Sequence, residues 1–423
     1  MIEPTIRCHT RWVVIYAALV ILVATGCGIQ RGDPAPTQRE PVPVLTPTPV
    51  NSISQVEQLP EPDPDSASPT SPPIATPTPT PRPPTATPTP RPSPTLTPSP
   101  TPTPAPALRR LTTGGCCTQP FWSPDSRQVL FIDQPAPDAP LGIWGVDTTR
   151  PEATPELFTE RIAFYTADMA FLVEPIQGTT VIERLADPEA GIESARWTVP
   201  NGGRSVSISP GRARIAWQVS DDNLPSERRT TQVWVANLDL DGSDAELVAT
   251  LPRGGLSGWV SDDVLLLSSR ESLESRETVV YTLSLVDGTS VELVRAERPR
   301  GTLLSPNGHW LAYYVTLSDE PAENGLWLVR TDGSERRELG KERFGAYQWR
   351  DARRLLIIPF DPQATFHELW ELDAETGEIR RLTDPNVTPF KIANGDWRAS
   401  PDGRQVAFVE SQDRNIWVLT LPE

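Results

Sequence analysis

Histidine, cysteine and lysine are scarce in this sequence. Its 423 residues include three histidines, four cysteines and two lysines, Lys341 and Lys391. Histidine and cysteine are common ligands of transition metals, and histidine is the most frequent general acid or base. We therefore predict no metal ion and no cofactor. No Gly-x-Ser-x-Gly nucleophile motif appears either, because "GLSGW" around Ser257 ends in Trp259.

Positive charge is also in short supply. The formal net charge is −17, and arginine carries almost all of the positive charge. Proteins that bind nucleic acids usually present a basic face to the phosphates. This balance argues against a nucleic-acid partner.

No apolar run is long enough for an ordinary membrane span, which needs about 20 residues. The first 27 residues carry Arg7 and Arg11, then the apolar run Val13–Ala24, then small residues and Cys27. This order is typical of a secretory signal. Its end, "VATGC", resembles a bacterial lipobox, which implies lipidation of Cys27, although Ala24 stands where leucine is most frequent. A retained anchor and an ordinary cleaved signal are the alternatives, and all three place the remainder outside the cytoplasm. We predict a protein that is lipid-anchored to a bacterial membrane, at the cell surface or in the periplasm.

Proline is abundant but confined. Of 49 prolines, 26 lie between Pro34 and Pro106. Proline fixes φ and lacks an amide donor, so such a run forms neither helix nor sheet and favours extended polyproline II. We predict that residues 28–107 form a disordered Pro/Thr-rich linker that spaces the folded part from the membrane.

Residues 108–423 repeat one unit. Its first half is an apolar stretch, a turn related to Ser-Pro-Asp-Gly, and a second apolar stretch, in "FWSPDSRQVLFI", "FYTADMAFLVE", "VSISPGRARIAW", "GWVSDDVLLLSS", "TLLSPNGHWLAYY", "YQWRDARRLLIIP" and "DWRASPDGRQVAFV". Its second half often contains tryptophan, in "GIWGVD", "TTVIERLAD", "QVWVANLDLDG", "YTLSLVDG", "GLWLVRTDG", "ELWELDAETG" and "NIWVLT". Seven units of roughly 45 residues, each with four short strands, indicate a β-propeller.

The two ends of the repeat region complement each other. The seventh unit stops after its third strand, while "LRRLTT" (Leu108–Thr113) closely matches the fourth strand "IRRLTD" (Ile379–Asp384). We therefore predict an all-β, seven-bladed β-propeller whose N-terminal strand closes the last blade and leaves no open edge. Six or eight blades remain compatible, because several units have lost the turn motif.

The repeats "WSPDSRQVLFID", "LLSPNGHWLAYY" and "WRASPDGRQVAFVE" resemble those of TolB-like propellers, bacterial relatives of the WD-repeat family. The resemblance implies protein–protein contact. The periodic Trp144, Trp234, Trp327, Trp370 and Trp417 are interpreted as packing between blades rather than as a carbohydrate platform.

A charge pattern predicts a binding face. The links from the fourth strand of one blade to the first strand of the next carry a basic set, namely Arg253, Arg298, Arg300, Lys341, Arg343 and Lys391. Neighbouring loops such as "SDDNLPSE" and "LSDEPAEN" are acidic. We predict a basic ring inside an acidic rim, which would hold an anionic ligand or an acidic segment of another envelope protein. Chance scatter of arginine on a solvated surface is the alternative.

Two functions stay open at this point. We favour a binding scaffold over an enzyme, and the alternative is an extracellular carbohydrate-active hydrolase or lyase with a site in the propeller channel. The adjacent Cys116 and Cys117 could pair as a vicinal disulfide in an oxidising compartment. A redox role, a structural lock on the turn, and two free thiols are all compatible with that pair.

Overall fold

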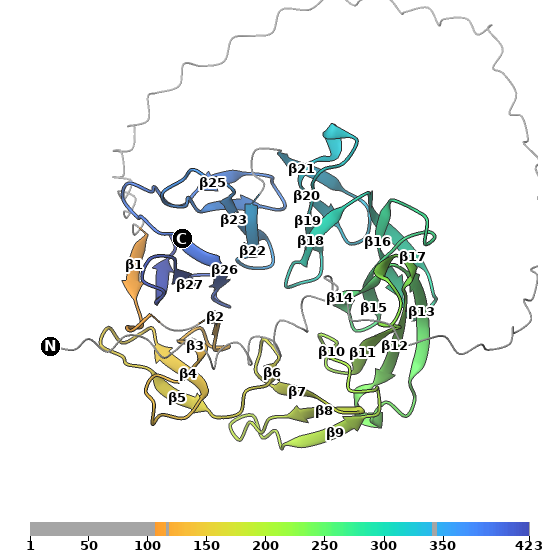
Figure 1. Ribbon diagram of the computed structural model, residues 1–423, viewed down its shortest axis with the longest axis horizontal. Helices are drawn as coiled ribbons and strands as arrows, with labels where there is room; N and C mark the ends of the chain where they lie inside the picture. The colour runs from red at the N-terminus through yellow and green to blue at the C-terminus, as the bar shows by residue number, and fades with distance from the viewer. Residues whose placement is uncertain (1–105, 116–117, 341–344, 423) are drawn as a thin grey trace, which may run out of the picture. The chain divides into compact units, whose positions relative to one another are not determined.

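The structure is a computed structural model that describes residues 106–115, 118–340 and 345–422. These residues form seven four-stranded antiparallel sheets arranged in a ring (Figure 1), so the predicted seven-bladed propeller is confirmed. Several predictions lie outside the described residues: the signal peptide 1–27 with Cys27, nearly all of the linker 28–107, Cys116, Cys117, Lys341 and Arg343.

Blades 1 to 4 follow one another along the chain, and each is a simple meander of four strands. Blade 1 contains β2 (Thr118–Trp122), β3 (Gln128–Asp133), β4 (Gly142–Asp147) and β5 (Glu156–Thr159). Blade 2 contains β6 (Phe164–Tyr165), β7 (Phe171–Ile176), β8 (Thr179–Arg184) and β9 (Ala195–Val199). Blade 3 contains β10 (Val206–Ile208), β11 (Arg214–Ser220), β12 (Thr230–Asn237) and β13 (Glu246–Pro252). Blade 4 contains β14 (Gly255–Ser261), β15 (Val264–Ser269), β16 (Thr278–Ser284) and β17 (Ser290–Ala296).

Blades 5 and 6 repeat this meander, and blade 7 takes its strands from both ends of the propeller. Blade 5 contains β18 (Pro299–Leu304), β19 (Trp310–Val315), β20 (Gly325–Arg330) and β21 (Arg336–Gly340). Blade 6 contains β22 (Gly345–Trp349), β23 (Arg354–Pro359), β24 (Trp370–Asp373) and β25 (Ile379–Arg381). Blade 7 contains β26 (Ile392–Ala399), β27 (Gln405–Glu410), β28 (Ile416–Thr420) and, as its outer strand, β1 (Ala107–Arg110).

The closing strand predicted from the sequence is present. β1 pairs antiparallel with β28, with Arg110 opposite Trp417. The ladder is shorter than the predicted Leu108–Thr113, but hydrogen bonding continues beyond it. The amide of Leu111 donates to the carbonyl of Ile416 at 2.8 Å, and the Thr112 hydroxyl accepts from the Ile416 amide at 2.9 Å. Both ends of the described propeller are thus joined within one sheet.

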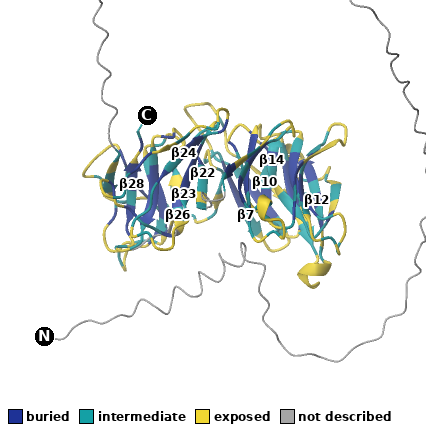
Figure 2. Ribbon diagram, turned by 90° about the horizontal axis from the view of Figure 1, so that it is seen from above, coloured by how far each residue is buried: buried dark blue, intermediate teal, exposed yellow. Residues whose placement is uncertain are grey.

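The apolar core lies between neighbouring blades, because each buried cluster combines residues of two adjacent blades. Figure 2 shows the buried residues within the strands and the exposed ones mainly in the connections. Between blades 7 and 1, for example, Trp122 and Phe131 pack in one cluster with Ala407 and Val418. The predicted role of the third-strand tryptophans holds, because each packs against such a cluster. These residues are Trp144, Trp234, Trp327, Trp370 and Trp417.

A second set of tryptophans, on the inner strands, links three of the blades to the preceding blade. The indole N–H of Trp122 donates to the carbonyl of Arg398 at 3.0 Å. In the same way Trp259 donates to Ser207 at 3.2 Å, and Trp349 donates to Leu303 at 3.1 Å. A buried indole N–H usually finds a partner, and here that partner fixes the spacing of adjacent inner strands.

The turn between the first two strands forms as its sequence predicts. In "SPNG" the Gly308 amide donates to the carbonyl of Ser305 at 2.8 Å, and in "SPDG" Gly403 donates to Ser400 at 2.9 Å. The fourth residue is left-handed, with φ of 72° and 69° respectively. Degenerate copies keep that conformation without glycine, since Ser126 has φ 62°. The turn hydrogen bond is kept there as well, since the Ser126 amide donates to the carbonyl of Ser123 at 2.9 Å.

Because the four strands follow the same order and direction in every blade, the connections between strands divide between two faces of the propeller. The turn face carries the connections between first and second strands and between third and fourth strands, including the short helix η2 (Leu238–Leu240). The loop face carries the connections between second and third strands and the links from blade to blade, including η1 (Ser226–Arg228) and η3 (Pro321–Glu323). Within the described ranges, the structure has no helix that is both long and apolar enough to cross a membrane.

Candidate functional site: an arginine hollow on the loop face

The structure places four of the six predicted basic residues on the loop face. Arg253 lies in the link from β13 to β14, Arg298 lies between β17 and β18, Arg300 lies in β18, and Lys391 directly precedes β26. Arg298 and Arg300 are exposed, whereas Arg253 and Lys391 are half-buried. The remaining two, Lys341 and Arg343, fall in the interval 341–344 that the structure does not describe.

The link that carries Arg253 runs unusually close to blade 4. A Cβ atom on Gly254 would lie 2.0 Å from the carbonyl oxygen of Ser268, so only glycine allows this approach. Arg253 itself is left-handed, with φ 50°. Its amide donates to Arg229 at 2.9 Å, and the amide of Arg270 donates to Pro252 at 2.9 Å. The "PRGG" segment thus brings Arg253 beside Arg270, which begins the loop after β15.

Arg270 also borders a surface hollow of about 360 Å³ between blades 4 and 5. The residues that line it come from three connections of the loop face: Arg270, Arg276, Glu297, Arg298 and Asp319. We call this feature the arginine hollow. The predicted acidic rim contributes Asp319, whose carboxylate lies 3.9 Å from the Arg276 guanidinium, with both side chains 82% exposed.

The guanidinium of Arg270 lies in an unfavourable electrostatic setting. Partial burial, and then the positive charge of Arg253, lower the pKa of Arg270. Arginine still remains protonated at neutral pH. One of its N–H groups donates to the carbonyl of Ser275. In the described part of the chain, none of Arg253, Arg270, Arg298 and Arg300 forms an ion pair with a carboxylate.

Arg295, another arginine of blade 4, is in contrast paired with carboxylates. Arg295, on β17, contacts Glu292 at 2.6 Å and Glu271 at 2.5 Å. The hydrogen bonds that Arg295 donates to Glu292 and Glu271 raise its pKa. Its charge is therefore satisfied within the protein, while the charges of Arg270 and Arg298 are left available to a ligand.

Planar guanidinium groups bind carboxylates and phosphates with paired hydrogen bonds, which are stronger when the site is partly desolvated. The arginine hollow can therefore hold an anionic group between Arg270 and Arg298. Glu297 and Asp319 at its border would repel an anion placed off-centre. The arrangement favours one or two negative charges in a defined position over a diffuse negative surface.

Lys391 lies apart from this cluster, at the link between blades 6 and 7. Its ammonium group donates to the carbonyl of Ala364 at 3.0 Å. Burial, followed by the charge of Lys391, lowers the pKa of His367. The structure thus gathers Arg253 and Arg298 around Arg270 and leaves Lys391 two blades further round the ring.

Comparisons with known proteins show the fold. The chain is similar in structure to an oligogalacturonate lyase in complex with manganese, with 15% identity, a TM-score of 0.52, and 76% of this chain and 96% of the other covered. An oligogalacturonate lyase from Vibrio parahaemolyticus gives 13% identity, a TM-score of 0.51 and the same coverages. TolB from Acinetobacter baumannii gives 13% identity and a TM-score of 0.35, over 69% of this chain and 78% of the other. No protein-family model and no curated protein sequence matches the chain.

At these identities the likeness extends to the propeller architecture and no further. Across the ranges that the structure describes, no group of three or more histidine, cysteine, aspartate or glutamate side chains gathers closely enough to hold a metal ion. The channel enzyme considered from the sequence stays an untested prediction.

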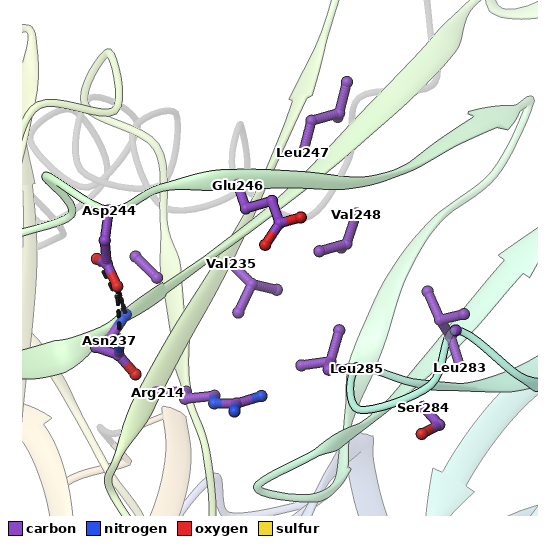
Figure 3. Close-up of a pocket in the computed structure, with 12 residues that line it drawn as sticks. Arg214, Val235, Asn237, Asp244, Glu246, Leu247, Val248, Leu283, Ser284 and Leu285 are labelled. Atoms are coloured by element: carbon purple, nitrogen blue, oxygen red, sulfur yellow. Dashed lines mark hydrogen bonds between the residues drawn. The ribbon is translucent and has the colours of Figure 1, made fainter.

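A second hollow, of about 350 Å³, lies on the turn face between blades 3 and 4 (Figure 3). Asn237, Asp244 and Arg214 in its wall already have partners, whereas Glu246 forms no ion pair within the described ranges. Asn237 donates to Asp244 at 2.7 Å, and Arg214 pairs with Asp263 at 3.0 Å. Apolar side chains such as Val235 and Leu285 provide most of the remaining wall shown in the figure. This hollow therefore offers less unsatisfied charge than the arginine hollow.

Sequence reasoning missed Arg270 and Arg276. Both belong to the segment "SRESLESRE" between the second and third strands of blade 4, whereas the basic residues were sought only in the blade-to-blade links. The signal was present, because both kinds of connection lie on the same face of a propeller. Counting arginines over the whole loop face would have found them.

Proposed function

We propose that this protein is an extracytoplasmic, lipid-anchored β-propeller that binds an acidic segment of another envelope protein, or a comparable anionic ligand, at the arginine hollow. The observation that carries the proposal is the position of Arg253, Arg270 and Arg298. Arg270 and Arg298 line a hollow of about 360 Å³ on the loop face, and Arg253 lies close enough to lower the pKa of Arg270. None of the three forms an ion pair with a carboxylate within the described ranges.

The location belongs to the proposal as well. It rests on the order of basic, apolar and small residues before Cys27 and on the proline-rich segment that follows. Lipid on Cys27 would anchor the chain, and an extended linker would hold the propeller at a distance from the bilayer. Intact-mass analysis of the protein from bacterial membranes tests this part, since the proposal expects cleavage before Cys27 and an added lipid mass.

Fluorescence anisotropy with a glutamate-rich peptide and a glutamine-rich peptide of equal length tests the binding site. We expect the full-length protein to bind the glutamate-rich peptide more tightly, and to lose affinity as salt is raised. The variant Arg270→Gln/Arg298→Gln should bind at least about tenfold more weakly, because each charge-assisted hydrogen bond contributes roughly 1.5–3 kcal/mol.

The matched control is Arg404→Gln. Arg404 is exposed and lies on the turn face, after the turn between β26 and β27. The Arg404→Gln variant should bind the glutamate-rich peptide with the affinity of the wild-type protein. Equal affinity of wild type and the double variant, or equal affinity for the two peptides, would contradict the proposed site.

A further inference from the structure

The hollow between blades 3 and 4 on the turn face, which we call the blade 3–4 hollow, has an apolar wall. Val235 and Val248 line it from blade 3, and Leu283 and Leu285 line it from blade 4 (Figure 3). All four side chains belong to or pack on the apolar cluster that joins these two blades, so they face one seam. The volume of about 350 Å³ lies within the range of ligand pockets, roughly 300–1,000 Å³, whose walls are mostly apolar. The blade 3–4 hollow therefore has the size and lining of a binding pocket.

The hollow stays open because the connection after β12 turns toward blade 2. Leu238 of η2 is buried in the cluster between blades 2 and 3. The Thr198 amide donates to the carboxylate of Asp241 at 3.1 Å. A Cβ atom on Gly242 would lie 2.9 Å from Cγ1 of Val199. The connection thus covers the seam between blades 2 and 3 and leaves the turn-face end of the next seam uncovered.

Paired polar groups hold the walls of the hollow in place. Arg214, at the start of β11, pairs with Asp263 of blade 4 at 3.0 Å, which joins the two blades below the opening. The Leu285 amide donates to the carbonyl of Asp263 at 2.8 Å. On the blade 3 side, the Asn237 amide group donates to Asp244 at 2.7 Å. A ligand would therefore meet a preorganised pocket and would not have to order its walls.

The border of the hollow is negatively charged. Glu246, the first residue of β13, stands opposite Val235 in the strand pairing, so both side chains lie on the face toward blade 4. Glu246 is exposed and forms no ion pair within the part of the chain that the structure describes. Residues 237–246 contain no basic side chain and four acidic ones, namely Asp239, Asp241, Asp244 and Glu246. A positively charged group beside the apolar wall would therefore be favoured, and an anion would be repelled.

We infer that the blade 3–4 hollow binds a large apolar side chain of a partner protein segment that carries lysine or arginine beside it. The apolar side chain would cover Leu283 and Leu285, and the basic residue would meet Glu246. The acidic border continues beyond the apolar wall, so the occupant must reach from one to the other, as a peptide segment does. A second copy of this chain fits poorly, because it would bring a net charge of −17.

This binding function goes beyond the one proposed for the arginine hollow. The blade 3–4 hollow lies on the turn face, whereas the arginine hollow lies on the loop face, and the two have opposite charge preferences. One propeller could therefore hold a basic segment on one face and an acidic segment on the other.

Selection from a displayed library of random dodecapeptides on the full-length protein, followed by fluorescence anisotropy with the enriched peptides, tests the inference. We expect a class of enriched peptides in which a large apolar residue lies beside lysine or arginine. The variant Val248→Ser/Leu285→Ser should weaken these peptides at least about tenfold, as truncation at an apolar anchor typically does. Glu246→Lys should weaken them at least about tenfold as well, because like charges would then face each other.

The Glu246→Lys variant guards against damage to the core, since it keeps every apolar side chain of the hollow and should melt like wild type. Its matched control is Glu378→Lys. Glu378 is exposed on the turn face of blade 6, directly before β25, and forms no ion pair within the described ranges. Glu378→Lys and Arg270→Gln/Arg298→Gln should both bind the basic peptides with wild-type affinity. The inference is overturned if no peptide is enriched, if only acidic peptides are enriched, or if Glu246→Lys binds the enriched peptides as tightly as wild type.

Discussion

Replacing Arg350 with methionine would remove a cation that the fold has buried between two blades. Arg350 directly follows β22, and its side chain is 3% exposed. Its Nε donates to the carbonyl of Gly403 at 2.6 Å and one Nη donates to Pro422 at 2.9 Å, both in blade 7. The other Nη pairs with Glu371, which is 5% exposed. One side chain therefore joins blade 6 to the closing blade.

The expected loss of stability follows from those contacts. Removing one partner of a buried ion pair costs about 3–5 kcal/mol. Arg380 still contacts the other oxygen of Glu371 at 2.7 Å, which lessens the penalty on that carboxylate. The carbonyl of Gly403, however, loses its donor inside the protein, at about 1–3 kcal/mol. Because these contributions overlap, we expect Arg350→Met to lower the free energy of unfolding by about 3–5 kcal/mol in total.

Urea titration of the full-length protein, followed by tryptophan fluorescence, measures this change. The control is Arg353→Met, because Arg353 pairs with Asp373 at 2.6 Å but is 53% exposed. An exposed pair contributes about 0–1 kcal/mol. We therefore expect Arg353→Met to change the free energy of unfolding by no more than about 1 kcal/mol. If Arg350→Met changes it by as little, the reasoning about the buried Arg350–Glu371 pair is refuted.

Two further predictions concern the ring and its turns. Deleting residues 107–113 should lower stability and promote aggregation, because blade 7 would expose the edge of β28. Thermal melting measures the stability and light scattering measures the aggregation. A deletion variant that melts like wild type would exclude the closing role of β1. Gly403→Ala should destabilise the protein more than Gly288→Ala. Both glycines are left-handed, with φ of 69° and 71° respectively. Only at position 403 would the new Cβ atom contact the backbone, at 2.9 Å from the carbonyl oxygen of Arg350. We expect about 1 kcal/mol for Gly288→Ala and a larger loss for Gly403→Ala, and equal urea midpoints would contradict the steric argument.

The sequence was sufficient to predict the propeller and its closure, because both depend on local patterns that repeat. Turn residues, alternating apolar stretches and the match between "LRRLTT" and "IRRLTD" each report on one strand or one pair of strands. The inner-strand tryptophans were also visible, in "FWSPD", "GWVSD" and "YQWRD", but their hydrogen bonds to the preceding blade need the register of neighbouring sheets.

The candidate site was predictable only in part. Arg253 and Arg298 were selected because the blade-to-blade links can be located from the repeat. Their meeting with Arg270 depends on how closely Gly254 approaches β15, which no pattern in the chain encodes.

The central claim is that the arginine hollow recognises an acidic partner in the cell envelope. The most direct test incubates full-length wild-type protein and Arg270→Gln/Arg298→Gln with envelope extract of the source organism, and quantifies the captured proteins and glycans by mass spectrometry. The account predicts an acidic protein that wild type captures at low salt and the double variant does not. Identical capture by both proteins, or capture of a glycan that shortens during incubation, would contradict it.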